Sequence, residues 1–325
     1  SKTELDFPDQ PAWTRYVEGG GTLARDDWRR SNVDTLIERI HQGIRQTKPW
    51  VRFGISPFGL GRPDLRPPGI QGFSQYHKLY ADVERWLQEG WLDYLAPQLY
   101  WPRDQKEQAF GPLLDYWHRQ NPKGRHVWAG LYTSRVAAAV DTSPRPGWSP
   151  QEITGQIDAV RARAPDSGHL HFSMVALLQN RQGLADALLA GPYAQPALVP
   201  ATPWLEPVAD VLAPRVALVQ RTGTGFSLQL TTPVGGSTPV LWAVWLRYAD
   251  RWELHVLAHP QRIFPTSRPG VPERPLNAIV VSAIDRVGRE SPRLGFGMGT
   301  KDGSVAISHA GHYRHDRDNP NGNDW

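Results

Sequence analysis

The stretch Asp93-Tyr94-Leu95-Ala96-Pro97-Gln98-Leu99-Tyr100-Trp101 decides the fold of the first part of this 325-residue chain. Its apolar residues run together instead of alternating with polar ones, which is typical of a strand buried on both faces of a parallel sheet. The stretch ends in an amide and two aromatic side chains. We therefore predict a parallel strand whose carboxyl end carries binding groups, because functional side chains gather there in (β/α) barrels.

Similar apolar runs occur before and after this stretch in the sequence, and each of them follows a helical segment. We predict further strands at residues 51–56, 125–132 and 169–175. The remaining elements are a loop over residues 1–24 and helices at 26–48, 75–88, 105–119, 149–163 and 183–189, with Ser149 and Glu152 forming a capping box. Four helix–strand repeats are half of the eight in a closed barrel, so the residues predict an open half of a barrel or a small open sheet.

The texture changes after residue 191. Residues 192–214 are rich in Pro and predict a linker, and residues 215–293 contain short β-branched and aromatic runs separated by turn residues. That spacing predicts a small β-sandwich of fibronectin type III or immunoglobulin-like form. Residues 294–325 are rich in Gly, Asp, Asn and His, and we predict a disordered tail there.

Composition excludes several classes of function. The chain has no Cys, so a disulfide framework, a thiol nucleophile and a Cys-ligated zinc are excluded. Its net charge of +4 comes without a run of like charges, which argues against a nucleic-acid groove. No stretch is long and apolar enough for a transmembrane helix. We find no motif for a metal or a phosphate-bearing cofactor, and predict neither. Fourteen Trp residues are many for this length, and flat aromatic faces commonly hold sugar rings.

Six side chains at or after the strand ends are candidates for substrate binding. They are an amide, a hydroxyl, a guanidinium and three aromatic groups, which can hydrogen-bond sugar hydroxyls and stack on pyranose faces. The same groups also occur as ordinary loop residues, and that reading stays open. The candidates are Ser56, Arg62, Gln98, Tyr100, Trp101 and Tyr132.

Catalytic carboxylates are missing from this set. Glycoside hydrolysis usually needs two carboxyl groups that flank the scissile bond. None of the four predicted strand ends carries an Asp or Glu, so no catalytic residue is assigned. The nearest carboxylates lie in loops, where ion-paired or solvated roles are common; they are Asp64, Asp104, Glu107 and Asp141.

An ordered series of motifs resembles the glycosyl hydrolase-like 10 family, formerly domain of unknown function 187. It comprises Asp27-Trp28-Arg29-Arg30-x-Asn32-Val33, then Phe53-Gly54-Ile55-Ser56-Pro57-Phe58-Gly59, then Tyr80-Ala81-Asp82 with Trp86, Gly90 and Trp91, then the opening stretch continued to Pro102. The resemblance covers about residues 1–190. It implies a (β/α)8 TIM-type barrel, often followed by a fibronectin-like module, in bacterial envelope proteins that are often lipoproteins. One branch of the family cleaves peptide-free glycan strands of peptidoglycan.

The resemblance also implies what this chain lacks. The family has an Asp-Asp-Tyr-type strand end just before the segment with which this chain opens, and that motif supplies the expected acidic residues. We therefore expect the C-terminal half of the barrel, as residues 1–191, followed by the β-module. The six candidates carry over as the substrate-side wall. The full-length protein would be periplasmic or an outer-membrane lipoprotein.

Two functions remain open at this stage. The first is a bacterial envelope glycoside hydrolase of peptide-poor peptidoglycan, of which the present chain is inactive alone. The second is a non-catalytic carbohydrate-binding or scaffold protein of the envelope. In both, the partner is a glycan, with the β-module as a surface for other envelope proteins; a third reading is an interaction protein that acts through the β-module alone.

Overall fold

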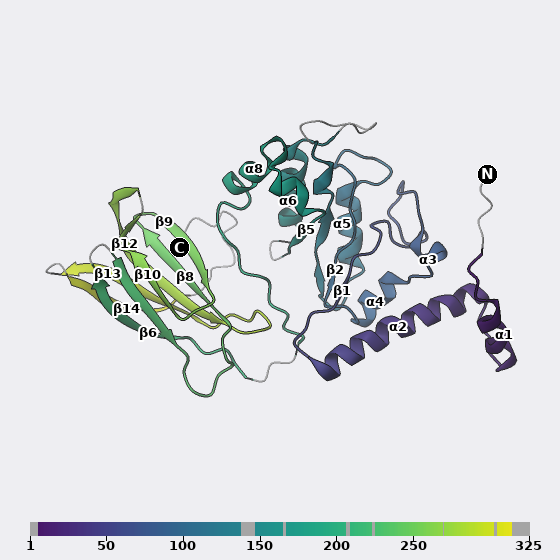
Figure 1. Cartoon of the computed structure of the whole chain (residues 1–325), viewed down its shortest axis with the longest axis horizontal. Coiled ribbons are helices and arrows are strands. Elements are labelled where there is room, and N and C mark those ends of the chain that lie inside the picture. Colours follow the sequence, from purple (N-terminus) through teal and green to yellow (C-terminus); the bar gives the residue numbers. More distant parts are fainter. Residues whose placement is uncertain are drawn as a thin grey trace. The chain divides into compact units, whose positions relative to one another are not determined.

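The computed structural model describes residues 6–137, 147–164, 167–205, 209–222, 225–268, 270–301 and 304–313. The chain divides into two compact units, Ser1–Ala185 and Asp186–Trp325, which Figure 1 shows as a mixed α/β part and an all-β part. In the described residues, no helix is long and apolar enough to cross a membrane.

The first unit is built on parallel strands that follow one another in sequence order. Strand β1 pairs with β2, β2 with β3, and β4 with β5, all parallel. Isolated parallel bridges join Phe58 to Gln98 and Gln98 to Gly130, so the two short sheets continue into each other. The strands are β1 (Gly54–Ile55), β2 (Tyr94–Leu95), β3 (His126–Val127), β4 (Ala129–Leu131) and β5 (His169–His171).

The two faces of this sheet differ because side chains alternate along a strand. Leu95, Leu99 and Leu131 are fully buried, together with the apolar residues of the helices between the strands. Side chains on the other face, such as those of Gln98 and Tyr100, are half-buried instead. The longer helices of this unit are α2 (Arg25–Thr47), α4 (Val83–Glu89), α5 (Phe110–Arg119) and α6 (Pro150–Arg163), and its short 3-10 segments are η1 (Thr133–Arg135) and η2 (Arg181–Gly183). Helix α8 (Leu184–Ala190) begins in this unit and ends in the second.

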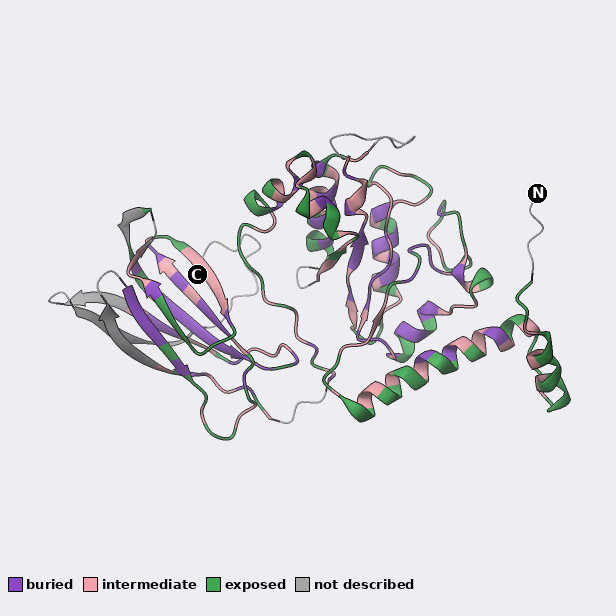
Figure 2. Ribbon diagram, in the orientation of Figure 1, coloured by how far each residue is buried: buried purple, intermediate pink, exposed green. Residues whose placement is uncertain are grey.

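Helix α2 is close to its predicted bounds but is only partly buried. Ile37 lies in the core, whereas Leu36 is 56% exposed. Its main link to the unit is polar, because Asp34 accepts a hydrogen bond from the indole nitrogen of Trp86 at 2.6 Å. The predicted loop over residues 1–24 is wrong in part, since helix α1 (Gln10–Glu18) lies there. Figure 2 shows α1 without a buried residue.

The predicted helix over residues 75–88 is two helices, α3 (Gln75–Lys78) and α4. Tyr80 takes a left-handed backbone conformation with φ of 53°, which ends the first helix. The carboxylate of Asp82 then accepts a hydrogen bond from the backbone nitrogen of Arg85 and starts the second. Gly90 ends α4 with φ of 75°, as its sequence position predicts.

Two further local predictions are wrong. The strand expected at residues 169–175 stops at His171, and Met174–Leu178 forms helix α7. A short apolar run fits either a strand or a helix, which explains this error. The capping box is also absent: Ser149 makes no side-chain cap, and Glu152 instead accepts a hydrogen bond from the backbone nitrogen of Arg103 at 2.9 Å.

The second unit is a pair of antiparallel sheets that share one apolar core. One sheet has the order β10-β7-β6, and the other β14-β13-β12-β8-β9, with β11 on β12. Phe226, Val244 and Val281 lie in the core between the two sheets. The strands are β6 (Arg215–Thr222), β7 (Gly225–Thr231), β8 (Leu241–Tyr248), β9 (Arg251–Leu257), β10 (Gln261–Pro265), β11 (Ser267–Arg268), β12 (Val271–Ile284), β13 (Arg293–Lys301) and β14 (Ser304–Tyr313).

Strands β13 and β14 occupy much of the segment that we predicted as a disordered tail. Leu294 and Phe296 alternate with glycines in β13, and both pack against the core. Because β13 pairs with β12 over residues 294–297 and with β14 over most of its length, backbone hydrogen bonds and a few apolar residues order a segment of low apolar content. Residues 314–325, the rest of the predicted tail, lie outside the described residues.

Candidate functional site

Gln98 links the ends of the first two strands. Its backbone pairs with Phe58 on one side and Gly130 on the other. Its side-chain nitrogen donates a hydrogen bond to the carbonyl oxygen of Ser56 at 3.1 Å and lies 3.5 Å from the hydroxyl oxygen of Ser56. The structure therefore brings two of the predicted residues together, with an amide beside a solvent-exposed hydroxyl.

One residue layer further along, three rings form a group that we call the aromatic cluster: Tyr100, Tyr132 and Phe172. The ring centroids of Tyr100 and Tyr132 are 5.0 Å apart, and those of Tyr132 and Phe172 are 5.7 Å apart. Trp148 meets Tyr132 edge-on at 6.1 Å. These distances are typical of aromatic contacts, so the ends of β2, β4 and β5 form a continuous aromatic surface.

Glycine makes room for this surface. A Cβ atom on Gly130 would lie 3.3 Å from a ring carbon of Tyr100 and 3.0 Å from the carbonyl oxygen of Pro97. The Tyr100 ring thus lies close over the backbone of the neighbouring strand. Burial raises the pKa of the Tyr100 hydroxyl, which stays a neutral hydrogen-bonding group at physiological pH.

Strand β5 carries two histidines, His169 and His171, directly before Phe172. Burial lowers the pKa of His169 and of His171 to about 4. Both imidazoles are therefore neutral at physiological pH. The Nδ1 atom of His171 is hydrogen-bonded to the hydroxyl of the buried Thr133 at 2.6 Å, which ties this side chain into the end of β4.

Two predicted residues are engaged elsewhere. The guanidinium of Arg62 pairs with Asp64 at 2.9 Å and lies 4.3 Å over the ring of Tyr76. The carbonyl oxygen of Trp101 accepts a hydrogen bond from Gln156 at 3.1 Å, and the ring contacts of the aromatic cluster given above do not include the Trp101 indole. Ser56, Gln98, Tyr100 and Tyr132 thus form the candidate site, with Arg62 and Trp101 outside its contacts.

In the described residues, the loop carboxylates named from the sequence make no contact with this site. Asp64 is exposed and ion-paired to Arg62, and Asp104 and Glu107 are exposed. Asp141 lies outside the described residues. In the part of the chain that the structure describes, no group of three His, Asp or Glu side chains could hold a metal ion.

The most buried carboxyl group with a shifted pKa lies beneath the loop that follows β1. Glu84 is 2% exposed and accepts hydrogen bonds from the backbone nitrogen of Arg62 at 2.8 Å and from the hydroxyl of Tyr116. Burial raises the pKa of Glu84 in spite of these bonds. Its contacts make it a support of the loop and place it away from the aromatic cluster.

Sequence reasoning missed Phe172 and Trp148 as partners of Tyr132. Phe172 follows β5 in the same position in which Tyr132 follows β4, so the register of parallel strands could have identified it. Trp148 reaches Tyr132 from a distant loop position, and no local pattern in the sequence signals that contact.

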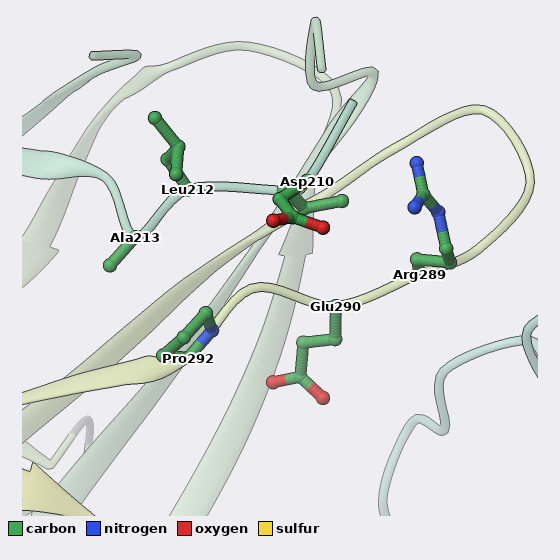
Figure 3. Close-up of a pocket in the computed structure, with 7 residues that line it drawn as sticks. Asp210, Leu212, Ala213, Arg289, Glu290 and Pro292 are labelled. Carbon is green, nitrogen blue, oxygen red and sulfur yellow. The ribbon is translucent and has the colours of Figure 1, made fainter. Parts of the chain in front are cut away.

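A surface cavity of about 450 Å³ lies in the second unit. Its lining includes Asp210, Arg289, Glu290 and Pro292, and Figure 3 shows Arg289 and Glu290 leaving the chain in opposite directions. Arg289 pairs with Asp285 at 2.8 Å, and Glu290 pairs with Arg293 at 2.7 Å. Because these charges satisfy each other within a turn, the cavity is a less suitable binding site than the strand ends of the first unit.

A match to a family model lies within the first unit, whereas the longer of two matches to curated proteins extends beyond it. Residues 3–149 match the model of the glycosyl hydrolase-like 10 family. Glycosyl hydrolase YngK of Bacillus subtilis (strain 168) is 38% identical over 230 residues, which cover 69% of this chain and 44% of that protein. Glycosyl hydrolase DigH of Escherichia coli (strain K12) is 37% identical over 112 residues, which cover 34% of this chain and 25% of that protein.

The chain thus spans less than half the length of these curated relatives. Among solved structures, chitinase ChiA74 from Bacillus thuringiensis is similar at 8% identity and a TM-score of 0.34, over 86% of this chain and 58% of that protein, which is too distant to establish a shared fold. The family match covers the motifs from which the resemblance was drawn. These matches confirm that residues 3–149 resemble the glycosyl hydrolase-like 10 family.

Proposed function

We propose that this chain carries the glycan-binding wall of a glycoside hydrolase-like protein that acts on cell-wall glycan. One observation carries the proposal: an amide, a hydroxyl and three rings in mutual contact converge at the carboxyl ends of consecutive parallel strands. Amide and hydroxyl groups bind sugar hydroxyls, and aromatic faces take the apolar faces of pyranose rings.

The proposed architecture is half of a (β/α)8 barrel followed by a fibronectin type III-like module. The strands of the first unit follow one another in sequence order within a parallel sheet, as they do around a barrel. In the second unit, β6, β7 and β10 face a second sheet across one core, in agreement with a small antiparallel sandwich. Residues 192–214 would then link the two.

The catalytic carboxylates of the full-length protein would lie on the other half of this barrel. None of the residues that end the described strands, including Ser56, Phe58, Gln98, Tyr100 and Tyr132, is an Asp or Glu. Since glycosidases usually need a carboxyl pair, this chain alone would bind glycan without cleaving it. The proposed substrate is peptide-poor peptidoglycan and the proposed compartment the bacterial envelope, as the family resemblance implies.

The absence of acidic strand ends also favours a second candidate. A protein that holds a glycan without hydrolysing it needs the aromatic cluster and the amide but no carboxyl pair. Such a carbohydrate-binding or scaffold protein would use the β-module to contact the wall or other envelope proteins. Activity of the full-length protein distinguishes the two candidates.

Calorimetry with peptide-free glycan strands tests the proposal. We expect the chain to bind them and Tyr132→Ala to bind more weakly, because a stacking face is lost. A matched control is Tyr193→Ala, an aromatic residue of the second unit. No binding by the wild-type chain, or equal binding by Tyr132→Ala, would contradict the proposal.

A further inference from the structure

Two phenylalanine rings lie exposed beside the candidate site. Phe58 and Phe73 are 43% and 42% exposed, and their ring centroids are 4.7 Å apart. Phe58 follows β1 and pairs through its backbone with Gln98, so this phenylalanine pair adjoins the amide that contacts Ser56. The loop that carries the pair comprises residues 57–73.

The buried side chain of Gln75 holds the backbone of Phe58, which carries the first of the two rings. Gln75 is 3% exposed, and its amide makes both hydrogen bonds that a backbone residue can offer. Its oxygen accepts from the backbone nitrogen of Phe58 at 3.0 Å, and its nitrogen donates to the carbonyl oxygen of Phe58 at 3.1 Å. The amide of Gln75 thus makes the two hydrogen bonds that a neighbouring strand would make with Phe58, and it leaves the backbone of Phe58 little freedom.

An arginine joins the two ends of the loop. Arg66 donates to the carbonyl oxygens of Leu60 at 2.9 Å, Gly72 at 3.0 Å and Phe73 at 2.6 Å. The indole nitrogen of Trp117 adds a bond to the carbonyl oxygen of Gly59 at 2.9 Å. The loop is therefore braced by polar side chains that are buried or partly buried, while its two rings are partly exposed to solvent.

A rigid exposed pair of rings is suited to binding. Loops that must order themselves lose affinity to the entropic cost of ordering, and a preformed loop avoids most of that cost. The core does not need these rings, because both leave a large part of their surface in water. Their position on the same side of Gln98 as the end of β1 puts them next along the row of strand ends from the aromatic cluster.

We propose that Phe58 and Phe73 form a second sugar-stacking subsite, which takes the apolar face of a further ring of the glycan that the aromatic cluster holds. This inference rests on the proposed function and deepens it. The cluster would bind one part of the chain, and the phenylalanine pair would bind a ring further along. Affinity should then grow with the length of the oligosaccharide, because only a glycan that extends past the aromatic cluster also reaches the phenylalanine pair.

Calorimetry with chitooligosaccharides from disaccharide to hexasaccharide tests the inference. We expect Phe58→Ala and Phe73→Ala to weaken hexasaccharide binding about fivefold and to leave disaccharide binding unchanged. Tyr100→Ala should weaken binding of both. Phe7→Ala, which removes an exposed ring of the same unit, is the matched control and should change neither.

Phe58→Leu distinguishes loss of the ring from a folding defect, since it keeps apolar volume but removes the flat ring. It should weaken binding of the longer oligosaccharide only. If wild type binds and all three phenylalanine variants keep its length dependence, the second subsite is refuted and the proposed function stands. If wild type binds no oligosaccharide of any length, both fall. Equal loss for disaccharide and hexasaccharide in Phe58→Leu would also refute a separate subsite.

Discussion

The rings of Tyr100 and Phe172 stack with centroids 5.4 Å apart and 19° between their planes, although they end β2 and β5, which are not neighbouring strands. Strands two places apart in a flat sheet lie about 9.6 Å apart. The rings close that distance by leaning over the intervening strand, where Gly130 offers no side chain. The strand ends therefore converge on the aromatic cluster.

This convergence makes Tyr100 the ring whose loss should matter most for binding. We expect Tyr100→Ala to weaken binding of peptide-free glycan by roughly 1 kcal/mol or more, because a stacking face is lost and Phe172 loses one of its two ring contacts in the cluster. Calorimetry at one pH and salt concentration measures the change. Phe7→Ala serves again as the control, and an affinity equal to that of wild type in Tyr100→Ala would count against a sugar platform.

The chain alone should not cleave its ligand. The residues that end the described strands carry no Asp or Glu, and Asp64 is held in an ion pair with Arg62. Incubation with peptide-free glycan strands, followed by chromatography of the products, should show no shortening beyond the buffer control. Shortening that grows with time and with protein concentration would overturn this prediction and place a catalytic pair within the chain.

Glu84 should make the stability of the first unit depend on pH. Burial raises the pKa of Glu84 in the folded chain, so the folded state holds its proton more tightly than the unfolded state does. The stabilisation is complete below the unfolded pKa near 4.5 and is lost as pH rises through the folded value. Glu84→Gln cannot ionise, so urea unfolding should show it gaining stability over wild type between pH 4 and pH 8.

The control for this experiment lies on the same helix. Glu89 is exposed, and Glu89→Gln should keep the pH dependence of wild type. A Glu84→Gln variant whose stability follows wild type at every pH would show that the carboxyl group does not titrate differently in the folded chain.

The bond between Trp86 and Asp34 should hold α2 on the unit. Asp34 is 5% exposed, and Trp86→Phe removes the indole donor 2.6 Å from its carboxylate. An unsatisfied buried acceptor costs about 1–3 kcal/mol, so urea unfolding should show a loss of that size. Arg85→Gln removes the other partner, whose side chain is 51% exposed, and should cost less than about 1 kcal/mol. Equal losses in the two variants would contradict this ranking.

Patterns within the sequence predicted the parallel strands because each apolar run lies between a helix and a loop. Ser56, Gln98, Tyr100 and Tyr132 were predicted for the same reason, since a strand end identifies its own residues. Arg62 was predicted with them, but its guanidinium pairs with Asp64, because Arg62 lies several residues into a loop whose path depends on buried partners such as Glu84.

Contacts between distant segments could not be read from local patterns. The break between α3 and α4 at Tyr80 depends on the left-handed backbone of Tyr80 and on Asp82, which caps α4. Glu152 does not complete a capping box because it accepts a hydrogen bond from Arg103, which lies in another loop. In the second unit, low apolar content predicted disorder, but pairing with β12 orders β13. Composition measures what a segment can bury and does not count the hydrogen bonds that a neighbouring strand provides.

The alternation along residues 94–101 has a consequence for how this protein can change during evolution. Leu95 and Leu99 serve the core, while Gln98 and Tyr100 serve the candidate site, and the two sets interleave residue by residue. Substitutions can alter one set and leave the other intact. A single inserted or deleted residue would exchange them, so this segment should accept point mutations far more readily than changes in length.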